Sequence, residues 1–103
     1  MDLRMRQAET QDKNLADERR PKRRGDLNYR SIDGETLILN RQDERLHQLN
    51  PTASFIWDCC DGNSNLADIV DRLAGAYDVD PSTARKDVEE VLSSLRSSNL
   101  LEE

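Results

Sequence analysis

The sequence has few of the residues on which catalytic and metal sites are built. Its 103 residues include one His, two Cys and four Gly. The glycines are isolated from one another, so they cannot form a glycine-rich phosphate loop. The two cysteines are adjacent, and on a helix their side chains would point about 100° apart, which prevents them from chelating one metal ion. We therefore expect a chain that is not an enzyme and that uses no metal and no cofactor.

Long apolar runs are also absent. No segment approaches the ~20 apolar residues that span a bilayer, and residues 1–14 contain no apolar region of the kind found in secretory signals. We expect a cytoplasmic protein without membrane contact, in which Cys59 and Cys60 remain thiols.

A basic surface is missing from most of the chain. Residues 27–103 hold 7 Lys/Arg and 15 Asp/Glu (net −8), whereas residues 1–26 hold 8 and 6 (net +2). A duplex binder needs Lys and Arg on one face to displace counterions, so the acidic part argues against a nucleic-acid partner. Residues 1–26 also lack aromatic residues and a clean helical period. We expect a mostly disordered charged arm over residues 1–26 and one domain over residues 27–103.

Three short strands are predicted in the first half of this domain. Residues 27–32 alternate between apolar and polar side chains, and residues 35–40 contain β-prone leucine and isoleucine. Asp33-Gly34 between them is typical of a two-residue hairpin turn, because both positions tolerate positive φ. Residues 41–44 are a polar turn and residues 45–49 a third strand. The result is an antiparallel meander with the third strand at an edge.

Three helices are predicted to follow. Asn50-Pro51 and Asp80-Pro81 each combine a capping side chain with a proline at the first helical position. We expect the first helix to end at Gly62, the second to begin near residues 64–65 and the third to end near residue 98. Apolar residues recur at helical spacing in the second helix (Leu66, Ile69, Val70, Leu73 and Tyr77) and in the third (Ala84, Val88, Val91 and Leu95), and Leu100-Leu101 closes the core.

The segment HQLNPTASFIWDCCDG, residues 47–62, contains the only histidine, the only tryptophan and both cysteines. Its predicted core stripe consists of Ala53, Ile56, Trp57 and Cys60. Cys59 would be partly exposed beside Phe55. Nucleophilic catalysis by Cys59 with His47 would need an orienting group and an oxyanion donor, and the sequence offers no convincing set. We interpret the segment as a structural helix and His47 as a structural or surface residue.

The same segment resembles the PqqD-like family, the peptide-recognition element of ribosomal natural-product biosynthesis. The matching pairs are Leu49-Asn50, Thr52-Ala53, Ile56-Trp57 and Asp61-Gly62. The likeness continues through LADIVDRLAGAYDVD (66–80) and DVEEVLSSLRSSNLL (87–101), so it covers about residues 27–101 and leaves out the arm. Asn99 stands where the family commonly has glycine, and Asn also tolerates the left-handed region. His47 stands where an aromatic residue is frequent, which would change one contact to the ligand.

The resemblance implies an α+β, winged-helix-like fold, with a three-stranded antiparallel sheet followed by a three-helix bundle. It also implies a function. Domains of this family bind the leader region of a precursor peptide and present it to a modifying enzyme, such as a radical SAM maturase or a leader peptidase. The third strand agrees with this function, because a leader can add to its edge as a further strand. The predicted backbone contacts are Arg45, Leu46, His47, Gln48 and Leu49.

The third helix supplies a candidate wall for the side chains of the peptide. Its apolar stripe is widened on one flank by Leu92, and Arg85 and Arg96 lie on the same flank. On this flank we predict an apolar wall of Val88 and Leu92, with Arg85 or Arg96 binding a carboxylate. The alternative is that Val88 and Leu92 are plain core residues.

Two other functions are left open by the residues. A winged-helix DNA-binding regulator would need a basic third helix, but this one balances Asp87, Glu89 and Glu90 against Arg85, Lys86 and Arg96. An adaptor that binds only a protein partner would use Phe55, Cys59 and the arm. The exposed third strand also permits an edge-paired dimer as well as a monomer.

Overall fold

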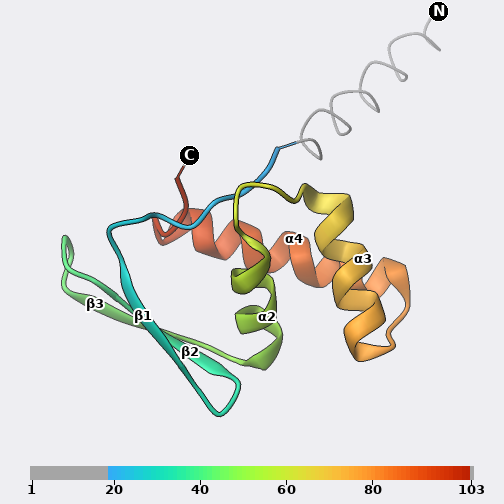
Figure 1. Cartoon of the computed structure of the whole chain (residues 1–103), viewed down its shortest axis with the longest axis horizontal. Coiled ribbons are helices and arrows are strands. Elements are labelled where there is room, and N and C mark those ends of the chain that lie inside the picture. Colours follow the sequence, from blue (N-terminus) through green and yellow to red (C-terminus); the bar gives the residue numbers. More distant parts are fainter. Residues whose placement is uncertain (1–18, 103) are drawn as a thin grey trace, which may run out of the picture.

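The computed structural model describes residues 19–102. Three strands come first and three helices follow: β1 (Asn28–Ile32), β2 (Glu35–Asn40), β3 (Arg45–Leu49), α2 (Pro51–Cys59), α3 (Leu66–Tyr77) and α4 (Pro81–Ser97). The sheet lies at one end of the molecule, and the helices pack together at the other end, with α2 between the sheet and the other two helices (Figure 1). This order of elements confirms the α+β, winged-helix-like fold predicted from the sequence.

The sheet is an antiparallel meander of order β1-β2-β3. Its first turn has the predicted two-residue form, since Asp33 (φ 54°) and Gly34 (φ 81°) both lie in the left-handed region and Ile32 pairs with Glu35. Along β2 the burial alternates: Thr36, Ile38 and Asn40 are buried, and the residues between them are not. The sheet therefore has an inner face toward the helices and an outer face without a helical cover among residues 19–102.

The helices begin where the capping residues predict. The Ala53 N–H donates to Asn50 Oδ1 at 2.8 Å, and the Ser82 N–H donates to Asp80 Oδ2 at 3.0 Å. Asn65 begins α3 with a reciprocal capping box in which its side chain and that of Asp68 each accept a backbone N–H. These capping hydrogen bonds join residues only two or three positions apart, so the sequence alone could predict them.

A segment ahead of the sheet joins the end of α2 to the residues that follow α4; we call residues 21–26 the N-terminal strap. Pro21 is buried. The Arg23 N–H donates to the Cys60 carbonyl at 3.0 Å, and the Arg24 N–H donates to the Leu100 carbonyl at 3.1 Å. The strap is thus part of the folded domain, and the boundary predicted at residue 27 is too late. Residues 1–18 of the predicted arm lie outside the described residues.

The strap also explains where α2 ends. Arg23 Nη1 donates to the carbonyls of Trp57 (2.9 Å) and Asp58 (3.0 Å), which a longer helix would have used itself. The helix consequently ends at Cys59, three residues before the predicted Gly62. Gly62 still adopts a positive φ of 84°, but in the loop after the helix.

The core lies between the inner face of the sheet and the three helices. Its centre holds Trp57, whose ring meets Tyr29 edge-to-face at 5.3 Å. Leu100 and Leu101 are buried as predicted. Two expectations are wrong: Cys59 is buried rather than partly exposed, and Tyr77 is 44% exposed, since it lies at the last residue of α3 and meets Phe55 at the surface.

Candidate functional site

The edge of β3 is the first part of the candidate site. Because β2 is the central strand, β3 has a strand neighbour on one side alone within residues 19–102. The outer side of a sheet edge presents backbone N–H and C=O groups that water or another chain must satisfy. In Figure 1 β3 lies with the rest of the sheet at the end of the molecule away from α3.

The register identifies which residues of β3 offer these groups. Ile32 and Glu35 close a two-residue turn, so this pair exchanges backbone hydrogen bonds. The alternation along β2 then directs the backbone of every second residue, starting at Thr36, toward β3. Their partners are the odd-numbered residues of β3. Leu46 and Gln48 therefore direct their backbone N–H and C=O groups to the open side.

The side chains of β3 divide between the two faces of the sheet. Leu46 and Gln48 share the outer face with their cross-strand partners on β2, while Arg45, His47 and Leu49 share the inner one. His47 is half-buried, and its Nε2 atom is closed from solvent without a hydrogen-bond partner among the described residues. Leu49 packs against the core.

A shallow pocket lies where β3 ends. Its lining combines the first residues after the strand, Asn50 and Thr52, with Asp87, Glu90 and Val91 of α4. We call it the α2–α4 pocket. One polar amide, one hydroxyl, two carboxylates and one apolar side chain meet there, which is a set suited to a peptide side chain with an apolar stem and a donor or cationic end.

The flank of α4 predicted from the sequence does not line this pocket. Val88 and Leu92 are 0% and 3% exposed and belong to the core, so the prediction that they form an open apolar wall is wrong. Their burial follows from their place beside Ala84 and Leu95 on the stripe that faces α2 and α3.

The two arginines of the predicted wall are also placed away from the pocket. Arg85 Nε donates to Glu89 Oε2 at 3.2 Å, one turn along the same helix. Arg96 is close enough to influence the Cys60 thiol, which lies at the opposite end of α2 from β3. At roughly 100° per residue, both lie on the opposite side of α4 from Asp87 and Glu90. The α2–α4 pocket gives no support to a peptide contact by either arginine.

Sequence reasoning missed Asp87, Glu90 and Val91. Val91 was assigned to the apolar stripe of the third helix, and the structure shows it half-buried. Asp87 and Glu90 were considered only as charges that oppose DNA binding, and the position of Asn50 and Thr52 beside them shows that they line a pocket.

The thiols are poorly placed for covalent chemistry. Burial raises the pKa of Cys60 to about 12, and burial likewise raises the pKa of Cys59. Neither forms a disulfide. Within residues 19–102 no three His, Cys, Asp or Glu side chains are grouped as metal ligands would be. The helices in this range are all too short or too polar to cross a membrane.

Comparison with known proteins places these features in a family. The family model described as coenzyme PQQ synthesis protein D matches residues 35–101. A curated relative from Methylococcus capsulatus, described as a PqqA binding protein, is 40% identical over 60 residues, which are 58% of this chain and 62% of that protein. The matched segment thus falls short of two thirds of the relative's own length.

Solved structures share the fold. TbiB1 in complex with the TbiA(beta) leader peptide has a TM-score of 0.71 at 28% identity, covering 79% of this chain and 94% of that one. A lasso peptide synthetase B1 complexed with a leader peptide has a TM-score of 0.72 at 21% identity, covering 82% and 99%. The PqqD part of Methylobacterium extorquens PqqCD, a stand-alone recognition element, has a TM-score of 0.66 at 22% identity, covering 81% and 88%.

The family match extends from β2 to the buried leucines after α4, and so includes the β3 edge, the α2–α4 pocket and most of the core. The chain therefore belongs to the coenzyme PQQ synthesis protein D (PqqD) family.

Proposed function

We propose that this protein binds the leader region of a ribosomally synthesised precursor peptide and presents it to a modifying enzyme. The observation that carries the proposal is the open edge of β3 beside the α2–α4 pocket. Membership of the PqqD family supports it, as do a relative described as a PqqA binding protein and a similar structure in complex with a leader peptide.

The backbone provides most of the affinity in this proposal. A leader strand added to β3 pairs with the outward N–H and C=O groups of Leu46 and Gln48. Such pairing tolerates many sequences, because every peptide has the same backbone groups. Its geometry also fixes which residues of the leader face the helices, since side chains alternate along a strand.

Side-chain selectivity in the proposal comes from the inner face. Every second residue of the leader points toward the helical side of β3, where His47 and the α2–α4 pocket lie. Asp87 and Glu90 favour a basic or hydrogen-bond-donating side chain, and Val91 favours an apolar one. This assignment replaces the wall of Val88 and Leu92 predicted from the sequence.

Binding without catalysis is the role that the chemistry of the chain supports. Both thiols are buried and have raised pKa values, so neither is a ready nucleophile. DNA binding has no support from α4, because the flank toward β3 carries Asp87 and Glu90, which repel phosphates.

The test is a titration of a fluorescent peptide, made from the leader of the neighbouring precursor gene, against three forms of the protein. Leu46→Pro removes an outward N–H from β3 without removing a bond to β2. Ser31→Pro is the matched control, because the register directs its N–H outward from the other edge strand, β1.

We expect the wild type and Ser31→Pro to bind equally and Leu46→Pro to bind about tenfold more weakly or not at all, with all three folded by circular dichroism. Equal losses in the two proline variants, or a Leu46→Pro variant that binds like the wild type, would rule out strand addition at β3.

A further inference from the structure

The outer face of the sheet is more apolar than a solvated face needs to be. Ile32 is 48% exposed, Leu39 38% and Leu46 66%, and Leu37 lies among them. An antiparallel sheet with one face in water normally carries polar side chains on that face. Here each of the three strands contributes at least one aliphatic residue to it.

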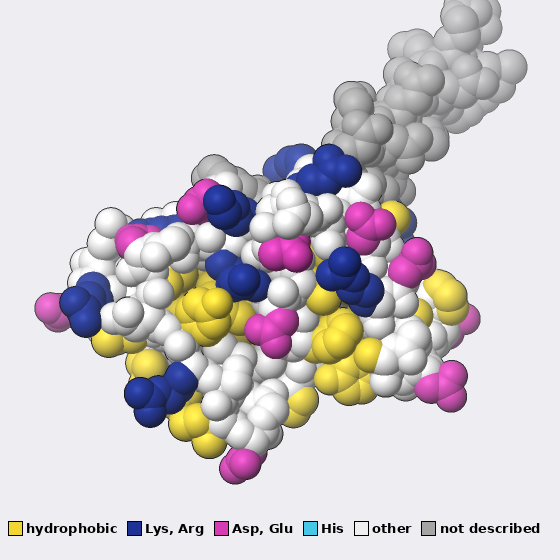
Figure 2. All heavy atoms as spheres, in the orientation of Figure 1, with side chains coloured by type: hydrophobic (Ala, Val, Ile, Leu, Met, Phe, Trp, Pro, Cys, Tyr) yellow, Lys and Arg dark blue, Asp and Glu magenta, His cyan; other side chains and the backbone are white. Residues whose placement is uncertain are grey.

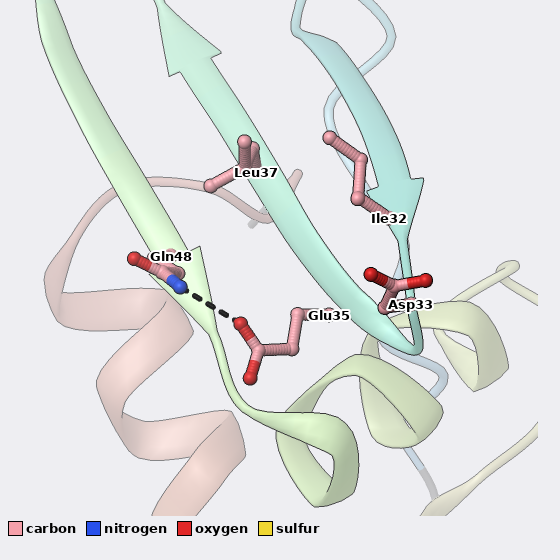
Figure 3. Close-up of a pocket in the computed structure, with 5 residues that line it drawn as sticks. All are labelled: Ile32, Asp33, Glu35, Leu37 and Gln48. Carbon is pink, nitrogen blue, oxygen red and sulfur yellow. Dashed lines mark hydrogen bonds between the residues drawn. The ribbon is translucent and has the colours of Figure 1, made fainter.

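These side chains form one continuous surface. Two shallow hollows lie on the face: one includes Leu37, Leu39 and Leu46, and the next includes Ile32 and Leu37 with Glu35. Figure 3 shows Ile32, Leu37 and Gln48 projecting from three neighbouring strands around the second hollow. Figure 2 shows hydrophobic side chains over the sheet end of the molecule, with Lys or Arg beside them.

Of the charged side chains Glu35 and Arg30 on this face, only Glu35 has a polar partner among residues 19–102. Glu35 Oε1 accepts a hydrogen bond from Gln48 Nε2 at 2.8 Å, so the carboxylate has a neighbour within the sheet. Arg30 lies halfway along the outer strand β1, opposite Leu37, and has no hydrogen-bond or ion-pair partner among residues 19–102. An exposed cation without a partner, set among aliphatic side chains, complements an apolar surface that carries a carboxylate.

The size of the face decides against a second copy of this chain as its occupant. Three strands about 4.8 Å apart and about 18 Å long give a footprint of roughly 250 Å². A stable dimer ordinarily buries about 800 Å² on each subunit. The footprint suits a transient contact, of the kind made with an enzyme that binds, acts and leaves.

The face is also continuous with the β3 edge. A strand added at β3 would extend the sheet by one strand, and its outward side chains would stand beside Leu46 and Gln48. A protein docked on the outer face would then touch the added peptide as well. Binding of the peptide and of that protein would strengthen each other by the same factor.

We propose that the outer face of the sheet docks the modifying enzyme, through an apolar patch bearing a carboxylate opposite Arg30, and that a bound leader completes this docking surface as its fourth strand. The coupling to the leader rests on the function proposed above. The choice of this enzyme as the partner rests on it too, but binding of the enzyme to the outer face can be measured without the peptide.

The test uses the purified modifying enzyme encoded beside the precursor gene as the probe, in biolayer interferometry with and without saturating leader. The variant Ile32→Thr/Leu39→Thr removes two exposed aliphatic side chains of the face, one on β1 and one on β2, and places a β-branched residue at both positions. Tyr77→Thr is the control, because it removes a side chain of similar exposure from α3, outside the face.

We expect the leader to tighten enzyme binding to the wild type. The double variant should bind the enzyme about tenfold more weakly and should change leader affinity by less than about threefold. The Tyr77→Thr variant should bind the enzyme as the wild type does. Arg30→Glu should weaken the enzyme complex most at low salt.

The outcomes separate the two proposals. If the leader fails to bind but the double variant still loses the enzyme, the docking face stands and the proposed function falls. If the double variant binds the enzyme as tightly as the wild type, or the wild type does not bind it, the docking proposal is overturned. A dimer in analytical ultracentrifugation that the double variant abolishes would assign the face to a second copy instead.

Discussion

The two outer strands of the sheet, β1 and β3, both have one side without a strand neighbour among residues 19–102, yet they are built differently. β1 is anchored through one aromatic side chain: Tyr29 meets Trp57 edge-to-face, and Arg23 of the strap lies over both rings at 5.8 and 5.9 Å. β3 continues directly into α2 through the cap Asn50 and borders a pocket lined by α4. One edge is anchored by packing, and the other is the edge at which we propose that the leader binds.

The largest effect that would sharpen this comparison is the loss of the anchor of β1. Tyr29→Ala removes the aromatic contact with Trp57 and the surface under Arg23. We expect the free energy of unfolding to fall by about 2 kcal/mol, with leader affinity unchanged at temperatures where the variant is folded. Urea denaturation measures the first quantity and peptide titration the second.

Ser31→Ala is the control for that change, because Ser31 lies on the same strand and face and is exposed. It should alter stability by less than about 0.5 kcal/mol. A Tyr29→Ala protein that loses leader affinity in its folded state would break the comparison, since β1 would then contribute to the binding site.

A smaller effect is expected from the pocket beside β3. Val91→Asp places a third carboxylate next to Asp87 and Glu90 and removes the apolar part of the lining. We expect leader affinity to fall about tenfold for a leader with an apolar side chain at this position. Ser93→Asp adds the same charge to an exposed position of α4 outside the pocket and should leave affinity unchanged.

The result for Val91 would be read together with circular dichroism, because this residue also packs against the core. Equal affinities for the Val91 and Ser93 variants would show that the leader does not enter the α2–α4 pocket, even if it adds to β3.

The smallest effect concerns pH and the start of α4. Hydrogen bonds from the Ser82 side chain and backbone hold the pKa of Asp80 below its usual 3.8. The folded-state pKa is therefore depressed, so the stabilisation is present above the unfolded pKa and is lost as the pH falls through the folded pKa. Thermal melting from pH 6 downward should show a slightly smaller loss below about pH 4 for Asp80→Asn, whose side chain caps without titrating.

This loss of stability at low pH should act on α4, which lines the pocket beside β3. The anchor of β1 should not contribute to it, because Arg23 stays charged at every pH of the experiment. Identical pH profiles for the wild type and Asp80→Asn would show that this cap does not contribute to the acid response.

Much of the fold could be predicted from the sequence because its signals are local. Asp33-Gly34 determines a turn through its own backbone preferences, and Asn50, Asn65 and Asp80 cap helices with atoms two or three residues away. The edge position of β3 followed from the meander. In these cases the interacting groups are neighbours in the chain.

The errors concern contacts between distant segments. A helical wheel gives the width of the stripe on α4 but not which neighbour covers each flank, so Val88 and Leu92 were assigned to a surface that α2 and α3 occupy. The strap was assigned to the arm because a basic run resembles a solvated tail, whereas Arg23 lies against the end of α2, 34 residues away in sequence. No local pattern records such a partner.

The strap has a last consequence, for the way this domain joins other proteins. The Lys22 carbonyl accepts the Glu102 N–H at 2.8 Å, so the first and last described segments run side by side, near the C-terminal end of α4 (Figure 1). Chain that leads away from residue 22 and chain that leads away from residue 102 therefore start side by side. An enzyme joined by a short linker to residue 22 or to residue 102 would therefore be tethered at a similar distance from the β3 edge, at an effective concentration on the order of millimolar. The order of the two domains in such a fusion would therefore change the distance between the enzyme and β3 little.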